Sequence, residues 1–251
     1  MNIVVAMKQI PDLQQIRIRN RKPVFDDVPM TLGAIDKNAL EVGVSIKESQ
    51  GGKVTVLSAG NEDLEDTIKE ALAAGADEAL LVIDDALAVA GSDVIAMVLA
   101  AAVKKMEAAE LIIFGEGSGD NYSGQVGSRV AAILDWPQVG YASSLELNGN
   151  MLRAARSLED GEEIVEVTLP AVVTVISGIN EPRIPSVTQI LKAGKKPKEV
   201  LEPEDLGLQI PAEAQVLSLS NLAPESERKQ VVLKSVDELV QALKNENVIG
   251  R

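Results

Sequence analysis

Short apolar runs alternate with segments of helical periodicity through the first half of the chain. Four runs have the length and composition of buried strands, at residues 3–7, 53–59, 79–83 and 111–114. Helical periodicity follows each run, at residues 34–48, 62–74, 92–106 and 123–134. This alternation predicts an α/β fold with a Rossmann-like, doubly wound, mostly parallel sheet covered by helices.

The pattern changes at Val139, where β-rich segments follow one another without helices between them. Short polar turns such as Asn148-Gly149-Asn150 and Asp160-Gly161 separate these segments. We therefore expect a β-hairpin extension of the sheet.

Periodicity is lost after about residue 194, where prolines are spaced through polar sequence as far as a final helical segment at residues 236–244. Long loops of this kind often reach a partner. We therefore expect residues 1–193 to form the folded domain and residues 194–251 to form a C-terminal arm with a terminal helix.

Composition restricts both the core and the chemistry. Apolar residues make up 46% of the chain but aromatic residues only 2%, so the core is built from Ala, Val, Ile and Leu, as in a buried parallel sheet. The chain has no Cys and no His, which excludes thiolate nucleophiles, Ser-His-Asp triads, zinc fingers, iron–sulfur clusters and His-ligated haem. Any redox chemistry therefore requires a bound organic cofactor.

Charge argues against nucleic-acid binding, because 38 acidic residues against 24 basic ones give a net charge of −14. The first residues, from Met1 to Ala6, carry neither a basic segment nor a long apolar run. We expect no signal peptide, no membrane insertion and a cytoplasmic location.

The most informative segment is the glycine-rich loop, residues 115–127, between the fourth strand and its helix. Glycines let backbone amides approach an anion, and a helix N-terminus offers free N–H groups. The loop matches neither GxGxxG nor GxxxxGK[ST]. Two interpretations stay open: a phosphate and ribose site, or a helix cap provided by Asp120 or Ser123. The candidate binding residues are Gly115, Gly117, Gly119, Asp120, Ser123, Gly124, Gln125 and Val126.

Two further strand ends meet the same sheet edge, at Ala6 to Lys8 and at Ala59 to Asn61. Lys8 could neutralise a phosphate or be a solvated surface lysine. Asp36, at the start of its helix, could hold a base or ribose, or could only complement the helix dipole.

Residues 180–187 (NEPRIPSV) follow the last strand, and their prolines stiffen a segment whose two apolar residues are expected to be exposed. Such a loop is either a docking element or an ordinary connection. The basic residues between Lys192 and Lys198 are expected to complement a helix end and to stay solvated.

Four ordered motifs resemble those of electron-transfer flavoprotein β subunits. LIIFGEGSGDNYSGQVG resembles the family's GxxxxDGDTxQVG loop, and VAMKQIPD resembles its VxVKxVPD opening. KEALAAGADEALLV and INEPRIPSVTQILKAGKKP resemble REALAMGADEAxL and LNEPRYPSLxxIMKAKKK. With LDWPQ at residues 134–138, the resemblance covers nearly the whole chain.

The resemblance implies a heterodimer with an α subunit that carries FAD, while this subunit binds AMP or, in electron-bifurcating members, a second FAD. Nucleotide contacts would fall on Ala6, Gly33, Ala34, Ile35, Asp36, Ala59 and residues 115–126. The loop that docks dehydrogenases would be residues 180–191. Its implied recognition residues are Asn180, Glu181, Pro182, Arg183, Val187 and Leu191.

The chain also departs from the family pattern. Gly119-Asp120-Asn121 replaces DGD, Ser123 replaces the usual Thr, and Val187 replaces the usual Leu anchor. The GEGSGDNY form resembles the branch of nitrogen-fixation and carnitine pathways, and residues 36–41 resemble the electron-bifurcating type.

The expected function is therefore that of an electron carrier rather than of an enzyme acting alone. With its α subunit it would pass electrons between an acyl-CoA-type dehydrogenase and a second acceptor, which could be a ferredoxin, a flavodoxin or a quinone reductase. Bifurcation from NADH would require the α subunit. The alternative is a stand-alone adenine-nucleotide sensor that resembles universal stress proteins.

Overall fold

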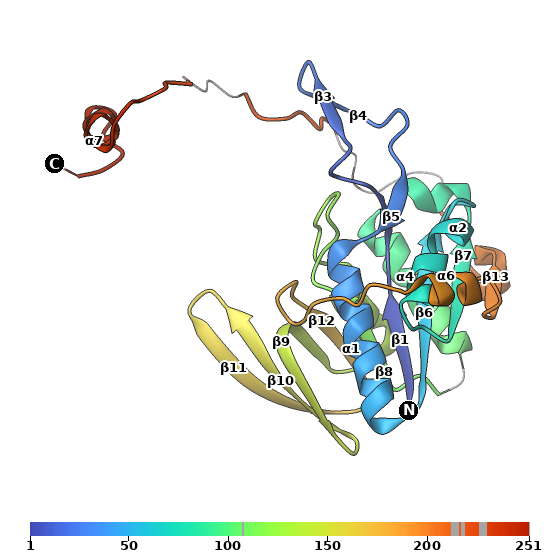
Figure 1. Ribbon diagram of the computed structural model, residues 1–251. Helices are drawn as coiled ribbons and strands as arrows, with labels where there is room; N and C mark the ends of the chain where they lie inside the picture. Colours follow the sequence, from blue (N-terminus) through green and yellow to red (C-terminus); the bar gives the residue numbers. More distant parts are fainter. Residues whose placement is uncertain (107, 212–215, 217–218, 226–229, 251) are drawn as a thin grey trace. The chain divides into compact units, whose positions relative to one another are not determined.

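The computed structural model describes residues 1–106, 108–211, 216, 219–225 and 230–250. Its chain divides into two units, the first formed by residues 1–17 and 25–219 and the second by residues 18–24 and 220–251. The first unit contains the sheet and its covering helices (Figure 1).

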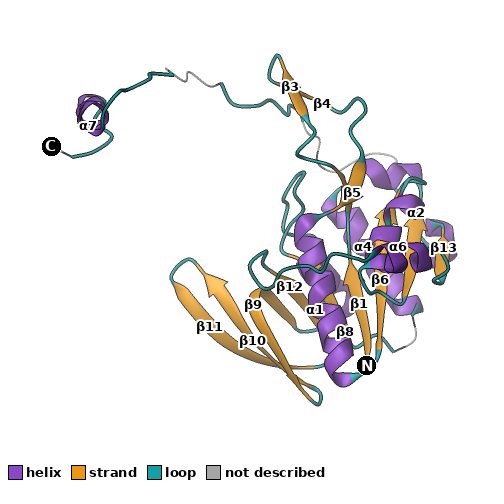
Figure 2. Cartoon of the chain, in the orientation of Figure 1, coloured by secondary structure: helices purple, strands orange, loops and turns teal. Residues whose placement is uncertain are grey.

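A nine-stranded sheet forms the centre of the first unit, with the strand order β11-β10-β9-β12-β8-β1-β6-β7-β13 (Figure 2). All pairings from β9 to β13 along this order are parallel, while β10 pairs antiparallel with both β9 and β11. The strands are β1 (Asn2–Ala6), β6 (Lys53–Gly60), β7 (Glu78–Ile83), β8 (Leu111–Gly115), β9 (Gln138–Asn148), β10 (Met151–Leu158), β11 (Gly161–Thr168), β12 (Ala171–Val175) and β13 (Lys198–Leu201).

This topology confirms the expected doubly wound α/β fold and its hairpin extension. The chain leaves β1 toward β6 and β7 on one side, then returns to β8 and β12 on the other. Strand order therefore reverses between β1 and β8, which is where ligands bind in open α/β sheets.

Two hydrophobic layers form because helices cover both faces of the sheet. The helices are α1 (Ala34–Gln50), α2 (Leu64–Thr67), α3 (Lys69–Ala73), α4 (Ser92–Lys105) and α5 (Val126–Leu134). Ile3 and Val5 of β1 pack with α1, α2 and α3, while Val4 and Ala6 pack with α4 and α5. Burial on both faces explains why the strands read as continuous apolar runs.

Several elements differ from the sequence prediction. The helix expected from Ser123 begins at Val126, because Gly124 has a left-handed φ of 63° that a helix cannot contain. The helix expected at residues 62–74 is two short helices, α2 and α3. The short antiparallel pair β2 (Gln9–Pro11) and β5 (Met30–Leu32) has no clear strand pattern in the sequence.

The segment after residue 194 contains two elements that the lost periodicity concealed. They are β13, which pairs with β7 at the sheet edge, and the 3-10 helix η2 (Pro203–Leu206). Residues 212–215, 217–218, 226–229 and 251 of the expected arm lie outside the described residues.

The basic residues after α6 (Val187–Ala193) are not simply solvated, contrary to expectation. The Lys196 ammonium group donates to the carbonyl oxygens of Leu72 at 2.7 Å and Ala76 at 2.5 Å. Lys198 forms an ion pair with Glu65 at 3.3 Å. Lys196 therefore fastens the chain to the end of α3 and the turn after it, where carbonyl oxygens lack partners within the helix, and Lys198 fastens it to α2 through Glu65.

The second unit contains the paired strands β3 (Arg17–Arg19) and β4 (Lys22–Val24) and the terminal helix α7 (Val236–Asn245). Arg21, in the turn between the strands, exchanges hydrogen bonds with the backbone of Ala223 and forms an ion pair with Glu225. The expected terminal helix is confirmed by α7, and none of its residues is buried.

Among the described residues, no helix combines the length and the apolar character needed to cross a membrane.

Candidate functional site

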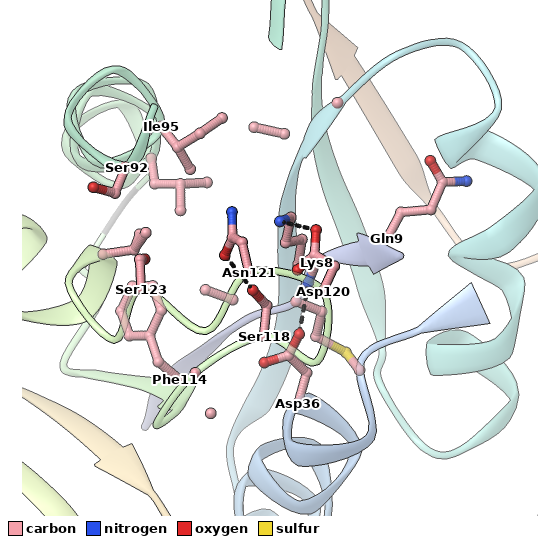
Figure 3. Close-up of a pocket in the computed structure, with 18 of the residues that line it drawn as sticks. Lys8, Gln9, Asp36, Ser92, Ile95, Phe114, Ser118, Asp120, Asn121 and Ser123 are labelled. Atoms are coloured by element: carbon pink, nitrogen blue, oxygen red, sulfur yellow. Dashed lines mark hydrogen bonds and ion pairs between the residues drawn. The ribbon is translucent and has the colours of Figure 1, made fainter. Parts of the chain in front are cut away.

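A cavity of about 380 Å³ lies at the carboxyl ends of the parallel strands, beside the reversal of strand order between β1 and β8 (Figure 3). Its lining comes from the ends of β1, β6 and β8, the glycine-rich loop, the first turn of α5 and the connection between β7 and α4. A cavity of this volume accommodates a small organic ligand.

Most of the predicted cofactor residues meet at this cavity. Those that line it are Ala6, Lys8, Asp36, Ala59, Gly115, Gly117, Asp120, Ser123, Gly124, Gln125 and Val126. Gly33, Ala34, Ile35 and Gly119 do not line it. A Cβ atom at Gly119 would lie 2.7 Å from a methyl group of Leu13, so this glycine faces the β2–β5 excursion instead.

The start of α5 lies open at the cavity wall. Gln125 is the N-cap residue, and no side chain among the described residues caps the helix, so neither Asp120 nor Ser123 has the predicted capping role. The Gln125 carboxamide oxygen instead accepts from Ser92 at 3.2 Å and from Arg129 at 2.8 Å. Uncapped amides and the positive end of the helix dipole favour an anionic group here.

Lys8 and Asp120 form an ion pair in the cavity lining, with 2.5 Å between the ammonium nitrogen and a carboxylate oxygen (Figure 3). Burial would raise the pKa of Asp120, but hydrogen bonds from Lys8 and Ser118 outweigh it and hold this pKa below its usual value. Lys8 is therefore not an unpaired surface lysine. Its charge is also not available to a phosphate alone, because Asp120 already shares it.

Asp36 is the most unusual group in the lining. Its side chain is buried, and one carboxyl oxygen accepts from the backbone N–H of Lys8 at 2.8 Å. Burial raises the pKa of Asp36 to about 7, although hydrogen bonds from the amides of Lys8 and Gly115 oppose the shift. The carboxyl group therefore links the ends of β1 and β8, which the sequence interpretation of a helix-dipole charge did not foresee.

A small organic ligand with an anionic group fits this arrangement. The volume is adequate, the uncapped start of α5 suits a phosphate, and the glycine-rich loop brings backbone against the cavity. Among the described residues no group of acidic side chains is arranged to hold a metal ion. The cavity therefore offers donors for an anionic group at one wall and polar side chains at the strand ends.

One wall of the cavity is formed by residues that the sequence analysis did not identify as candidates. The 3-10 helix η1 (Asp85–Val89) and the residues after it contribute Leu87, Val89 and Ser92 to the lining. This segment follows β7, and the carboxyl ends of parallel strands share one edge, so strand order alone indicates its place at the cavity. Its plain apolar composition gave no chemical signal.

Two polar anchors hold the segment of residues 180–191 against α1. The Arg183 guanidinium group donates to Glu41 at 2.7 and 2.9 Å and to Glu48 at 2.6 and 3.0 Å. Asn180 exchanges hydrogen bonds with Asn38, at 2.8 Å in one direction and 3.1 Å in the other. Hydrogen bonds to Arg183 outweigh burial and lower the pKa of Glu41.

The same segment exposes apolar side chains on its outer surface. Ile184 is 94% exposed and Val187 is 74% exposed, as is Leu191. The two residues expected to be exposed are therefore confirmed as such. Ser186 caps α6 through a capping box with Gln189, which fixes the direction of this short helix. Polar residues anchored to α1 on one side and exposed apolar residues on the other are typical of a docking surface.

Comparison with known proteins places the chain among proteins of one family. A family model for the electron transfer flavoprotein domain matches residues 24–206. The chain is 41% identical over 209 residues to electron transfer flavoprotein subunit beta of Thermoanaerobacterium thermosaccharolyticum, a match that covers 82% of this chain and 80% of that one.

Two further relatives extend the comparison. The subunit CarD of the caffeyl-CoA reductase-Etf complex of Acetobacterium woodii is 35% identical, with 83% of this chain and 80% of that one covered. Electron transfer flavoprotein subunit beta of Bacillus subtilis is also 35% identical, with 98% of both chains covered. The last match extends into the segment after β13.

Proposed function

We propose, from the premise that this chain belongs to the electron transfer flavoprotein β-subunit family, that it binds an adenine nucleotide in the strand-end cavity and acts as one subunit of an electron carrier. The observation that carries the proposal is the cavity at the β1–β8 reversal, which adjoins an uncapped helix start. The absence of Cys and His means that this chain supplies no redox group of its own.

The nucleotide is AMP or the adenine half of FAD. The uncapped amides of α5, with Ser123 and Gly124 beside them, would receive the phosphate, and Asp120 would be available to a ribose hydroxyl. Gly33, Ala34 and Ile35 precede Asp36 at the start of α1 and would contribute backbone contacts if the bound molecule extends beyond the cavity. A bound flavin would supply the electron-transfer chemistry.

The second proposed component is an α subunit that carries FAD. The relatives support this, since all three described above are named as subunits of electron transfer flavoproteins or of an Etf complex. These names also favour a redox subunit over a stand-alone nucleotide sensor. We assign the α-subunit contact to residues 194–251, where α7 exposes Val236, Leu239 and Val240.

The dehydrogenase would dock on the segment of residues 180–191. Arg183 and Asn180 fasten this segment to α1, so Val187 and Leu191 are presented on a fixed support. Glu181 and Pro182 lie in the same exposed stretch. The kinship to an Etf complex with caffeyl-CoA reductase supports a dehydrogenase of the acyl-CoA type.

The electron path after docking belongs to the same proposal. The second acceptor would be a ferredoxin, a flavodoxin or a quinone reductase. If this subunit holds FAD, the complex would divide the electrons of NADH between acceptors of high and low potential.

Copurification tests the subunit assignment. The chain is tagged and coexpressed with an α-type flavoprotein from the same genome, and an untagged partner is expected in equal amount after affinity purification. A matched preparation that lacks residues 236–250 is expected to retain less partner, since it lacks the exposed face of α7. If the tagged full chain recovers no α-type flavoprotein while both proteins are made, the subunit assignment is wrong.

A further inference from the structure

The Asp36 carboxyl group, from the first turn of α1, lies at the sheet edge where a ligand anion would ordinarily be expected. The amides of Lys8 and Gly115 follow β1 and β8, the two strands between which the order reverses. Both amides donate to the Asp36 carboxyl group, with 2.8 Å from the nitrogen of Lys8 to an oxygen of Asp36. The protein therefore places its own acidic group on the strand-end amides.

The surrounding backbone is shaped around this carboxyl group. A Cβ atom at Gly33 would lie 2.7 Å from one carboxyl oxygen, and a Cβ atom at Gly115 would lie 2.7 Å from the other. Both distances are too short for real atoms, so glycine at these positions leaves the space that the carboxyl group fills. Asp36 itself is only 8% exposed and still contributes to the cavity lining.

Charge near the strand ends also disfavours a phosphate there. The Lys8 charge favours the ionised form of Asp36, but the ammonium group itself is paired with Asp120. Asp120 and Glu116 bring acidic groups from the glycine-rich loop. At the other side of the cavity, the start of α5 has uncapped amides, and Arg129 lies on its first turn.

We infer that Asp36 is a positioning residue of the nucleotide site, which takes the strand-end amides for itself and so directs the phosphate of a bound nucleotide to the start of α5. The uncharged part of the ligand, base or ribose, is left to the strand ends. This inference rests on the proposed nucleotide binding and adds the residue that sets the orientation. An anion that already holds the amides excludes a second anion by repulsion and by lack of donors.

Competition between adenosine and sulfate tests the inference on the full-length chain after removal of bound nucleotide. Sulfate stands for the phosphate, and its charge does not change between pH 6 and pH 8. At pH 8 we expect saturating sulfate to leave adenosine affinity unchanged in the wild type, because the two ligands occupy different ends of the cavity. In Asp36→Ala, sulfate reaches the strand-end amides, and adenosine affinity falls by about tenfold when sulfate is added.

Asp160→Ala, in the exposed turn between β10 and β11, is the matched control and should behave as the wild type. Equal competition by sulfate in the wild type and Asp36→Ala overturns the inference. The inference is also overturned if Asp36→Ala is folded, as judged by circular dichroism, and its adenosine affinity does not change when sulfate is added.

Asp36→Asn gives a second readout if Asp36→Ala does not fold. Because the pKa of Asp36 is about 7, the wild type should resist sulfate at pH 8 and lose resistance at pH 6. The neutral variant should show sulfate competition at both pH values, which assigns the change to Asp36 rather than to Lys8, Asp120 or Glu116. A variant that keeps the wild-type pH dependence overturns the inference. If the wild type binds neither AMP nor adenosine, the proposed function itself fails.

Discussion

The buried carboxyl group of Asp36 should make the stability of the protein depend on pH in a specific direction. Its pKa is raised from 3.8 to about 7 on folding, with burial as the largest cause. The folded state therefore holds a proton that the unfolded state has released, so stability falls as pH rises through this window. The contribution is fully present below about pH 4 and is lost above about pH 7.

The magnitude follows from the size of the shift. About three pKa units correspond to about 4 kcal/mol over the whole window. Part of this is already lost at pH 5, because the unfolded group is mostly ionised there. Between pH 5 and pH 8 the remaining loss is about 2–3 kcal/mol.

Denaturant unfolding of the wild type and Asp36→Asn at pH 5 and pH 8 measures this contribution. The variant cannot ionise at position 36, so the difference in unfolding free energy between the two proteins should change by about 2–3 kcal/mol from pH 5 to pH 8, in favour of the variant. Other titrating groups are common to both proteins and cancel in this comparison. If the two proteins lose or gain stability in parallel over this range, the burial of an ionisable carboxyl group at Asp36 is refuted.

Three further substitutions probe the segment of residues 180–191, its anchor to α1 and the cavity. Val187→Ala should weaken electron transfer with the dehydrogenase about fivefold through lost apolar contact, with unchanged thermal stability, and steady-state transfer at varied dehydrogenase concentration measures it. Arg183→Ala removes the cation from the largely buried Glu41 carboxylate, so the unfolding free energy should fall by about 2 kcal/mol, whereas no change would mean that the anchor contributes nothing. Asp120→Ala should lower the nucleotide retained after purification, and full occupancy would show that its pairing with Lys8 has only a structural role.

Hydrophobic periodicity is sufficient to predict the sheet. Continuous apolar runs such as residues 111–114 identify strands buried on both faces, and both faces are indeed covered. The short strand β13 is not predicted because it lies at the sheet edge, where Glu199 and Val200 are exposed and no apolar run develops. The early helix start at Ser123 is wrong because the left-handed conformation of Gly124 cannot be read from composition alone.

The candidate site is partly predictable for a topological reason. Strand ends in a parallel sheet share one edge, so the order of strands along the sequence is enough to bring Lys8, Ala59 and Gly115 together. The role of Asp36 is not predictable in this way, because its hydrogen bonds join residues far apart in sequence. The ion pairs of Arg183 with α1 depend on tertiary packing for the same reason.

Nucleotide release from the purified complex tests whether the strand-end cavity holds an adenine nucleotide. The full-length chain is coexpressed with its α subunit, the complex is denatured, and FAD and AMP are quantified per heterodimer. We expect one adenine nucleotide for this chain in addition to the FAD of the α subunit, so either two FAD or one FAD with one AMP. Two FAD would support bifurcation, and one of each would indicate a simple carrier. A complex that releases a single FAD and no AMP would contradict nucleotide binding in the strand-end cavity.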